Sequence, residues 1–591
     1  MGLIVQKFGG TSVGSIPRIR QVAERVLLTV RQGYSVVVVV SAMGHETDRL
    51  MGLALELSPD PCQRELDMLL STGEQVSIAL VAMALQQVGL TAVSLTGAQV
   101  GIVTECQHTQ ARILKIRTQR VRQHLDRGEV VVVAGFQGVM MGEHLEVTTL
   151  GRGGSDTTAV ALAAALDAVC CEIYTDVAGV YTTDPRLVPA ATLVPEITSE
   201  EMLELASVGA QVLHPRAVEI AQNYGVGVIV RSNWHDFPGT KVRCGPRRHR
   251  DFENMEVARP VERVEVDPTQ AKIALLRVPD RPGVAQQLFA ALADSGVDVD
   301  LVIQSVHSDQ RNDIAFTVRR EYWETAQRVA QVVGAQLGCA VTLDRQIAKV
   351  SVVGVGVRSR AGIAAQMFAT LARLGVNIQM ISTSEIKLSC VIDLAQAALV
   401  KVALETTFDL PPSTEITSPP ALTLKAVRGV ALDRDQARLA VQGIPDRPGM
   451  AAKLLEQLAQ GGITVDMIIQ SQRGEGQPLQ DIALTVPRSQ LTLAQQVIER
   501  AARGLGCEQV TASADVVKVS AVGAGMVGTP GIAARMFGAL AEQAINIQMI
   551  STSDIKVSCV VAEAAAHQAL EAVHTAFGLQ SQEAACLEAP P

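Results

Sequence analysis

Apolar residues in the first 250 positions form near-continuous runs, separated by longer segments with a helical period. The runs include SVVVVVSA at 35–42, EVVVVAGF at 129–136 and VGVIVRS at 226–232. Strands with one wet face alternate polar and apolar residues, whereas strands buried on both faces do not. The pattern therefore predicts an α/β domain over residues 1–250, a mostly parallel sheet sandwiched by helices. Ligands of such sheets bind at the carboxyl ends of the strands, so functional residues are expected in the loops that follow them.

The pattern changes after residue 250 to short strands and amphipathic helices. Residues 272–345 read in order as strand, Gly/Pro loop, helix, strand, strand, helix and strand. This order is the β-α-β-β-α-β plan of a ferredoxin-like α+β module. The same order begins again near residue 349.

The second half of the chain is an internal duplication. PDRPG occurs at 279–283 and again at 445–449, and the long segment GIAAQMFATLARLGVNIQMISTSEIKLSCVI from Gly362 recurs in closely similar form from Gly531. Repetition of this length indicates that a folded unit was copied. We therefore predict an N-terminal domain and four α+β modules, with a polar, proline-containing connector near 410–420. The predicted domains are 1–250, 268–345, 346–425, 436–513 and 514–591.

Composition and charge narrow the classes of function. The 591 residues are 48% hydrophobic and 19% charged with a net charge of −9, which fits a compact protein and argues against nucleic acid as a partner. Purely apolar runs, such as VVVVV at 36–40, are far shorter than the roughly 20 residues that cross a bilayer. Patterned sequence begins almost at Met1, so we expect a cytoplasmic protein without membrane contact. The ten cysteines include no CxxC pair, which predicts reduced thiols rather than disulfides or a zinc site.

The first candidate site lies at the end of the first strand, in KFGGTS at 7–12. Lys7 ends the strand, and Gly9 and Gly10 allow backbone amides to approach an anion before a helix begins. A phosphate would fit there, although the spacing differs from that of a Walker loop. A lysine that reaches solvent beside a tight turn is the alternative interpretation.

The segment TTLGRGGSDTTAVALAAAL at 148–166 predicts a second anion site. Three glycines flank Arg152, which can bind a carboxylate with two hydrogen bonds. Ser155 and Asp156 open a helix, whose N-terminus favours anions. Asp156 would be an unusual phosphate ligand, so we expect it to orient Lys7 or an ammonium group. A helix capped by Ser155 or Asp156 is the alternative.

Two other loops follow predicted strands. YTDVAGVYTTDPR at 174–186 could hold adenine and ribose, with Arg186 reaching the phosphates, or could be a plain strand and turn. SAMGHETD at 41–48 supplies Ser41 and Thr47 as possible donors.

Two titratable residues have simple structural interpretations as well. Glu74, in STGEQ, opens a helix, where an acid also stabilises the helix dipole. His214 precedes a proline, and we expect it to pack or cap rather than to catalyse.

Taken together, KFGGTS, STGEQ at 71–75, GRGGSDTTA at 151–159, YTDVAGVYTTDPR and the repeated DRPG…NIQMIST pattern closely resemble aspartate kinase, a member of the amino acid kinase superfamily. The resemblance covers nearly the whole chain and implies an amino acid kinase fold followed by four ACT domains, which bind amino acids and regulate the enzyme. It implies ATP-dependent phosphorylation of the β-carboxylate of L-aspartate to 4-phospho-L-aspartate, the entry step to lysine, threonine, methionine and diaminopimelate synthesis. The usual form has two ACT domains, so the number and assignment of the effector sites stay open.

This chemistry suits the residues present. A carboxylate with an ordinary pKa near 4 is ionised at neutral pH, so its attack on the γ-phosphate needs no general base. The reaction does need two anions held together and a stabilised phosphoryl group. We expect Lys7 to stabilise that group.

The resemblance also implies a role for each matching residue. Catalysis would belong to Lys7, Arg152 and Asp156. For aspartate, the resemblance implies that Glu74 binds its ammonium and that Arg152 and Ser155 bind its carboxylate. The residues implied for this substrate are Ser41, Thr47, Glu74, Gly153, Gly154 and Ser155. The residues implied for ATP are Lys7, Phe8, Gly9, Gly10, Tyr174, Thr175, Asp176, Tyr181, Asp184, Arg186 and Lys241. Mg²⁺ is expected to bind through ATP and water, without protein ligands.

Regulation would follow from the ACT modules, whose DRPG loops present amides that suit an effector's α-carboxylate. ACT domains of this family pair side by side, so we expect Asp280 and Gln304 of the first module to face Asn377 and Ile378 of the second. The residues expected to repeat that pocket are Asp446, Gln470, Asn546 and Ile547. Lysine, threonine or both would shift the kinase toward an inactive state, unless the modules serve only for dimerisation. A homodimer is expected because edge strands of ACT sheets commonly pair between chains.

Two other functions stay open. One is a kinase of another amino acid or of a carbamate, against which Glu74 and the paired ACT repeats argue. The other is an amino-acid sensor whose kinase half is inactive, against which Lys7, Arg152 and Asp156 argue. ATP turnover with aspartate distinguishes all three.

Overall fold

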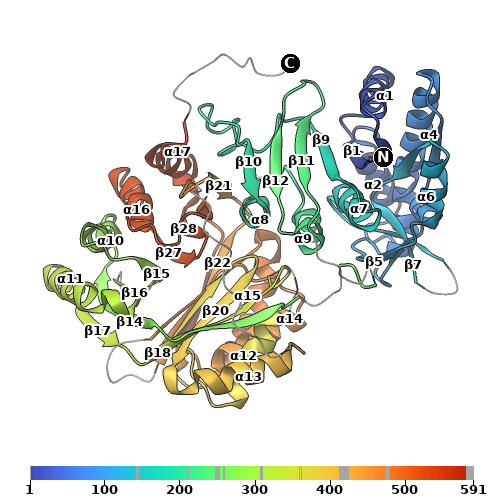
Figure 1. The fold of residues 1–591 in the computed structure, drawn as a ribbon. Coiled ribbons are helices and arrows are strands. Elements are labelled where there is room, and N and C mark those ends of the chain that lie inside the picture. The colour runs from blue at the N-terminus through green and yellow to red at the C-terminus, as the bar shows by residue number, and fades with distance from the viewer. Residues whose placement is uncertain are drawn as a thin grey trace. The chain divides into compact units, whose positions relative to one another are not determined.

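The computed structural model describes residues 2–141, 145–209, 212–246, 253–256, 260–306, 311–358, 360, 362–411, 425–472 and 479–580. It divides the chain into two compact units, Met1–Tyr181 with Leu193–Ala258, and Thr182–Thr192 with Arg259–Pro591. Each unit can be followed along the coloured ribbon in Figure 1. Most of the connector predicted near 410–420 lies outside the described residues.

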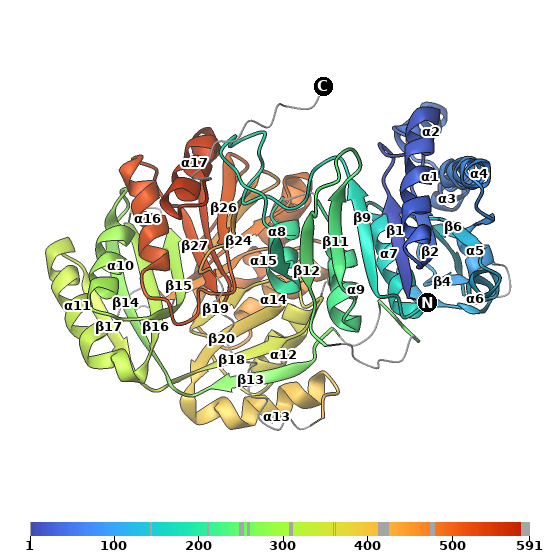
Figure 2. The ribbon, with the colours of Figure 1, turned by 45° about the horizontal axis from the view of Figure 1, so that its top comes forward.

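An eight-stranded sheet forms the centre of the first unit, in the order β10-β12-β11-β9-β1-β2-β6-β3. The strands are β1 (Leu3–Phe8), β2 (Ser35–Val40), β3 (Ala92–Leu95), β6 (Val130–Ala134), β9 (Cys170–Thr175), β10 (Glu196–Thr198), β11 (Val228–Ser232) and β12 (Thr240–Arg243). Neighbours are parallel except β11 and β12. Figure 2 shows β12, β11, β9, β1 and β2 side by side. The predicted mostly parallel sheet is confirmed.

Helices cover both faces of this sheet. α1 (Ile16–Arg31) and α4 (Thr72–Gln87) pack together over one face, against Val36, Val38 and Val40 of β2. On the opposite face α7 (Gly154–Ala165) packs against β1, β9 and α9 (Pro215–Tyr224). Alanine dominates α7, and its residues 154–164 are all buried, because small side chains let a helix approach the sheet closely.

The remaining elements of the first unit flank this core. The helices are α2 (Glu46–Leu57), α3 (Gln63–Leu70), α5 (Gly97–Val100), α6 (Gln119–Asp126) and α8 (Ser199–Ser207). A small second sheet runs β5-β4-β7-β8, with β4 (Ile102–Thr104), β5 (Ile113–Ile116), β7 (Gln137–Met140) and β8 (Val147–Thr149).

One apolar stretch of the described chain, Gln63–Gln87, is long and apolar enough to cross a membrane by length and composition alone. It comprises α3 and α4, and half of it is buried. Ile78, Val81 and Leu85 of α4 belong to the hydrophobic cluster beneath α1. This packing is that of a core helix that covers the eight-stranded sheet.

The second unit contains the four repeated modules, named ACT1 to ACT4 in chain order. ACT1 comprises β14 (Gln270–Pro279), α10 (Val284–Asp294), β15 (Val299–Val306), β16 (Arg311–Arg319), α11 (Trp323–Leu337) and β17 (Ala340–Asp344). ACT2 comprises β18 (Ile347–Val353), α12 (Ile363–Arg373), β19 (Met380–Thr383), β20 (Lys387–Asp393) and α13 (Ala397–Thr407). ACT3 comprises β22 (Ala437–Pro445), α14 (Met450–Gln460), β23 (Ile468–Gln472), β24 (Leu479–Val486), α15 (Leu491–Leu505) and β25 (Gln509–Ser513). ACT4 comprises β26 (Val516–Val522), α16 (Ile532–Glu542), β27 (Met549–Ser553), β28 (Lys556–Ala562) and α17 (Ala566–Ala576).

Two strands that precede ACT1 and ACT3 complete the sheets of other modules. β13 (Arg263–Asp267) pairs with β18 of ACT2, and β21 (Gly429–Asp433) pairs with β26 of ACT4. In the described chain, ACT1 is therefore inserted between two parts of ACT2, and ACT3 between two parts of ACT4.

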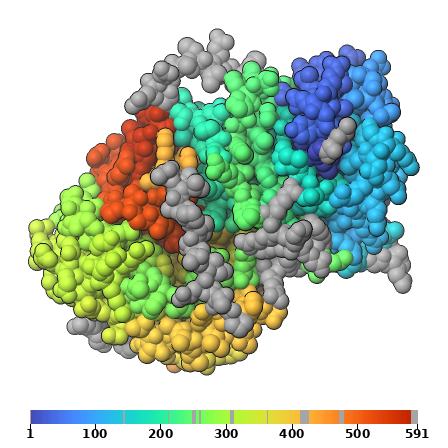
Figure 3. Space-filling model, viewed as in Figure 1, coloured from blue at the N-terminus to red at the C-terminus, as the bar shows by residue number. Residues whose placement is uncertain are grey.

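The modules do not pair in the order expected from the sequence. β15 of ACT1 pairs antiparallel with β27 of ACT4, which makes one eight-stranded sheet of the two modules. Figure 3 shows the red ACT4 segment directly against the yellow-green ACT1 segment. ACT2 instead lies beside ACT3, with α12 packed on α14 and β19 beside β23. The prediction that the first module faces the second is wrong, because the duplicated edge strands are nearly identical and do not encode which copy is the partner.

The two pairs share one core. A cluster of buried apolar residues takes Leu301 from ACT1, Met380 from ACT2, Met467 from ACT3 and Met549 from ACT4. The four modules therefore pack as a single body rather than as separate domains.

Candidate active site

The first unit brings Lys7 and Asp156 into direct contact. Lys7 is near the end of β1, and Asp156 lies in the first turn of α7. The Lys7 Nζ lies 2.7 Å from the Asp156 Oδ1, and both side chains are 12% exposed. The two side chains therefore form an ion pair at the carboxyl end of a central strand and the N-terminus of a helix, and the role of Asp156 in orienting the ammonium group stays a prediction.

Ser41, Ser155 and Glu74 extend this cluster. The Ser41 hydroxyl donates to the Ser155 Oγ at 3.0 Å, and Ser155 precedes Asp156 in α7. One residue after Ser41, the backbone N–H of Ala42 donates to the Glu74 Oε1 at 3.0 Å. The structure thus connects the predicted residues of β1, the loop after β2, α4 and α7 by a chain of short contacts.

Close backbone approaches explain two glycines in this region. A Cβ on Gly10 would lie 2.8 Å from the Ala42 O and 2.9 Å from the Gly44 O, and the Gly44 N–H donates to the Gly10 O. A Cβ on Gly135 would lie 2.7 Å from the Ser155 Oγ. Gly135 was not singled out from the sequence, although its position directly after a buried strand places it at the ligand edge.

The structure shows no hydrogen bond or ion pair between the cluster and the side chains of Arg152 and Thr47 among the described residues. Arg152 is exposed, and no interaction of its side chain is found within the described chain. The glycines on either side, Gly151 and Gly153, have φ of 77° and 68°, which favour glycine. Thr47 is half-buried in α2, and the structure does not join it to the cluster by a hydrogen bond.

His214 packs against the glycine loop, which confirms its predicted structural role. A Cβ on Gly153 would lie 2.2 Å from the His214 Cγ. His214 occupies the N-cap position of α9 but makes no side-chain cap bond. Burial, followed by the charge of Arg216, lowers the pKa of His214, so the imidazole is neutral at pH 7.

The predicted nucleotide residues of the first unit fall into two groups. Phe8 and Tyr174 stack on each other with ring centroids 4.7 Å apart and are 1% and 3% exposed, so only their backbone can meet a nucleotide. Thr175, Asp176 and Tyr181 follow the end of β9, and Lys241 is exposed on β12. Within this group, the Thr175 hydroxyl donates a hydrogen bond to the Asp176 Oδ1 at 3.0 Å.

Asp184 and Arg186 belong to the second unit. Arg186 forms an ion pair with Asp184 at 2.8 Å, and the Arg186 side chain is 84% exposed. Their segment is anchored in that unit, where the Thr182 Oγ1 lies 2.9 Å from the His574 Nε2. Their role toward ATP stays a prediction.

The predicted effector residues form two equivalent clusters in the second unit. The Asn546 side chain donates to the Asp280 Oδ1 at 2.8 Å, and the Gln304 side chain donates to the Ile547 O at 2.8 Å. The corresponding bonds of the other pair are Asn377 to Asp446 at 2.9 Å and Gln470 to the Ile378 O at 2.6 Å. Asp280 and Gln304 therefore face Asn546 and Ile547, and Asn377 and Ile378 face Asp446 and Gln470.

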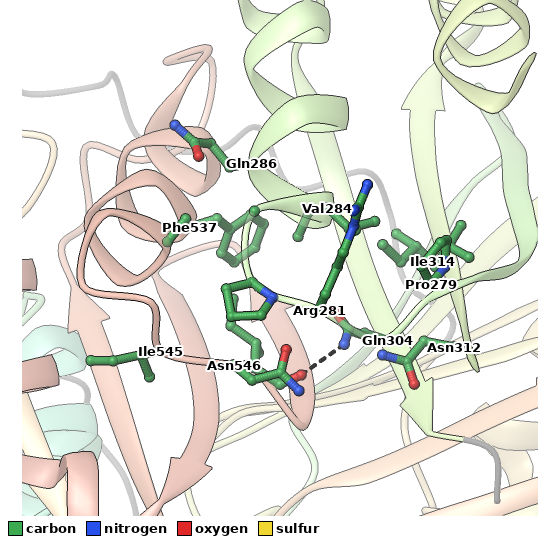
Figure 4. Close-up of a pocket in the computed structure, with 16 residues that line it drawn as sticks. Pro279, Arg281, Val284, Gln286, Gln304, Asn312, Ile314, Phe537, Ile545 and Asn546 are labelled. Atoms are coloured by element: carbon green, nitrogen blue, oxygen red, sulfur yellow. Dashed lines mark hydrogen bonds between the residues drawn. The ribbon is translucent and has the colours of Figure 1, made fainter. Parts of the chain in front are cut away.

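An open pocket lies beside the first of these clusters. Its wall combines Gln304 and Asn312 with Arg281, Phe537 and Asn546, as Figure 4 shows. The pocket offers a cationic side chain, amides and an apolar wall, which suits a small zwitterion.

Burial changes the proton affinity of Glu74. The side chain is 2% exposed, and its Oε2 has no hydrogen-bond partner in the described structure. Burial raises the pKa of Glu74 to about 7, against the opposing effect of the Ala42 N–H. A buried, unpartnered carboxylate oxygen is a ready partner for a substrate ammonium.

The pKa of Glu74 predicts a pH dependence of aspartate binding. Only ionised Glu74 attracts an ammonium, and its ionised fraction rises about tenfold between pH 6 and pH 8 for a pKa near 7. The KM for aspartate should therefore fall as pH rises through 7, and Glu74→Gln should give a high, pH-independent KM. Steady-state kinetics over this range test it, with the KM for ATP as the control. An unchanged slope in the Gln variant would contradict the role of Glu74.

Comparison with known protein families assigns the two parts of the chain to an amino acid kinase family and to ACT domain families. Residues 2–232 match the family described as "Amino acid kinase family". Residues 272–321, 350–408 and 519–577 match families described as "ACT domain".

Individual similar proteins identify the family more narrowly than the domain matches do. The chain is 51% identical over 412 residues to the aspartate kinase of Pseudomonas putida, covering 69% of this chain and 98% of that one. It is 51% identical over 393 residues to the aspartokinase of Geobacillus stearothermophilus, covering 66% and 94%. The crystal structure of the aspartate kinase from Synechocystis matches with a TM-score of 0.85 and 53% identity, over 99% of this chain and 100% of that one. The chain belongs to the aspartate kinase family.

Proposed function

We propose that this chain phosphorylates the β-carboxylate of L-aspartate with ATP, giving 4-phospho-L-aspartate and ADP. The observation that carries the proposal is the cluster of Lys7, Asp156, Ser155, Ser41 and Glu74 at the carboxyl ends of β1 and β2. One end of this cluster presents an ammonium group and the other an unpartnered carboxylate oxygen. An amino acid with a side-chain acid is complementary to both ends. The product would enter lysine, threonine and methionine synthesis.

The residues divide the work by charge. Glu74 would bind the substrate ammonium, and Arg152 with Ser155 would bind its α-carboxylate, leaving the β-carboxylate directed at Lys7. Because that carboxylate is already ionised, no residue needs to remove a proton. Lys7, held by Asp156, stabilises the charge on the transferring phosphoryl group, and the amides of Gly9 and Gly10 add hydrogen bonds.

Magnesium would be bound by ATP rather than by a protein cage. The described residues contain no group of three or more His, Cys, Asp or Glu side chains arranged for a metal. Mg²⁺ keeps several waters and commonly binds through substrate phosphates, which fits a site with cationic and amide groups. Its chemistry there would be to neutralise phosphate charge.

A substrate comparison tests the proposal. Coupled ADP release is measured with aspartate, with glutamate and without an acid. Turnover with aspartate alone supports the proposal, and preference for glutamate favours a kinase of another amino acid. Absence of turnover with every acid favours an inactive sensor.

The ACT pockets would bind lysine, threonine or both as feedback inhibitors. Each of the two clusters joins two modules, so a ligand there can favour one arrangement of the pair over another. The chain would act as a homodimer, although β15 and β27 pair within the chain, so contacts between chains would use other edges.

Two matched substitutions separate the pockets. Asn546→Ala removes a hydrogen bond from the ACT1–ACT4 cluster, and Asn377→Ala removes its counterpart from the ACT2–ACT3 cluster. Each variant should lose a different binding event in calorimetry with lysine and threonine, with affinity about tenfold weaker, as expected for one hydrogen bond to a charged group. Turnover without effectors should not change. A wild-type chain that gives no heat with either amino acid would refute the regulatory role.

A further inference from the structure

Two residues with unusual backbone conformations lie beside the glycine loop that carries Arg152. Among the described residues eight non-glycine residues have positive φ, and two of them, Thr109 at 66° and Phe136 at 69°, lie against this loop. A Cβ on Gly151 would lie 3.1 Å from the Thr109 O, and the Leu150 N–H donates to the Phe136 O at 2.8 Å. A β-branched residue such as Thr109 rarely adopts this conformation, so neighbouring groups must hold it.

Asp67 is the group that holds Thr109. The Thr109 N–H lies 3.1 Å from both Asp67 carboxylate oxygens, and the His108 Nδ1 lies 2.7 Å from the Asp67 Oδ2. Asp67 is 0% exposed and projects from α3. No sequence motif pointed to it.

The Asp67 carboxylate also binds Thr149, which lies just before the glycine loop. The Thr149 hydroxyl donates to the Asp67 Oδ1 at 2.5 Å, and Thr149 is the last residue of β8. The Ala111 N–H donates to the Thr149 O at 3.0 Å, so the segments that contain Thr109 and Thr149 are tied to each other as well.

We propose that Asp67 is a positioning residue for the aspartate-binding loop. A buried carboxylate is costly, and an apolar side chain would satisfy packing alone, so its hydrogen bonds to Thr109 and Thr149 indicate a need for fixed geometry. Asp67 fixes the backbone of the loop that carries Arg152, and it does not contact the substrate. The inference rests on the proposed function, because it assigns Arg152 to the substrate carboxylate.

Thr149→Val is the first test. It removes one hydroxyl bond to Asp67 without changing the size of the side chain, and the KM for aspartate should rise about tenfold while the KM for ATP stays within about twofold. Thr148→Val is the matched control, because the buried Thr148 hydroxyl pairs with the Thr104 hydroxyl instead and its loss should leave the KM for aspartate unchanged.

A second test combines Asp67→Ala with Thr109→Gly, a substitution expected to restore part of the lost aspartate binding. Asp67→Ala should raise the KM for aspartate about 100-fold, and Asp67→Asn, which keeps an acceptor, should raise it less. Adding Thr109→Gly to Asp67→Ala should lower the KM at least about fivefold, because glycine adopts a φ of 66° without strain. A purely structural role predicts that the KM values for both substrates change together and that Thr109→Gly restores nothing.

The outcomes distinguish this inference from the proposed function. Wild-type enzyme without aspartate turnover contradicts the function itself. Normal wild-type turnover with equal effects of Thr149→Val and Thr148→Val contradicts only the positioning role. If Asp67→Ala fails to fold, the comparison of the two threonine variants still decides.

Discussion

Replacing Lys7 by alanine is expected to lower kcat by about 1,000-fold or more, because no other cation within the described active-site cluster can stabilise the transferring phosphoryl group. The KM for aspartate should change little, since Glu74 and Arg152 bind the other end of the substrate. Initial rates of ADP release measure the effect, and thermal unfolding checks that the variant is folded.

Lys115→Ala is the matched control for this substitution. Lys115 pairs with Glu253 at 3.0 Å in the same unit, away from the cluster, and its loss should leave kcat unchanged. A Lys7→Ala enzyme that is folded and keeps a tenth of wild-type activity would show that Lys7 does not have the assigned role.

Replacing Arg152 by alanine is expected to raise the KM for aspartate about 100-fold, since an arginine–carboxylate pair contributes two charge-assisted hydrogen bonds. Arg152→Lys should recover only a small part of the loss, because an ammonium group cannot reproduce the planar fork of a guanidinium. The exposure of Arg152 means that thermal stability should stay close to wild type in both variants.

Arg120→Ala provides the control for charge alone. Arg120 is an exposed arginine on α6 of the same unit, and its removal should leave both KM values unchanged. If Arg152→Lys binds aspartate as well as wild type, the bidentate geometry is not required and the assignment of Arg152 is wrong.

The kinase sheet was predictable from the sequence because burial on both faces leaves a direct pattern. The valines of β2 and β6 read as uninterrupted apolar runs, and the structure pairs these two strands inside the sheet, where each has a strand on both sides. The repeats were visible for a similar reason, since a duplicated folded unit keeps its apolar positions.

The pairing of the modules was not predictable by the same reasoning. VDLVIQS of ACT1 and VDMIIQS of ACT3 are almost the same edge, and NIQMISTS occurs in both ACT2 and ACT4. The local sequence shows that each of these edge strands needs a neighbouring strand. Which of the duplicated modules supplies that strand depends on how the chain connects the modules, including the insertion of ACT1 after β13.

In the candidate site too, some residues were predictable from the sequence and others were revealed only by the fold. Lys7, Ser41, Ser155 and Asp156 were found because strand ends and helix starts are recognisable positions, and the structure connects them. Asp67 carries only a weaker signal, a carboxylate on the apolar side of α3 between Leu66 and Leu70. Its partners, Thr109 and Thr149, are distant in sequence and meet it only in the fold.

The most direct test of the central claim is transfer of the terminal phosphate of ATP to the aspartate side chain in a single turnover. Enzyme is mixed with γ-labelled ATP, Mg²⁺ and aspartate without lysine or threonine, and acyl phosphate is trapped with hydroxylamine. Wild type should give aspartyl hydroxamate in equal amount to ADP, and Lys7→Ala almost none. ATP consumption without hydroxamate, or no ATP consumption by the folded wild-type chain, would contradict it.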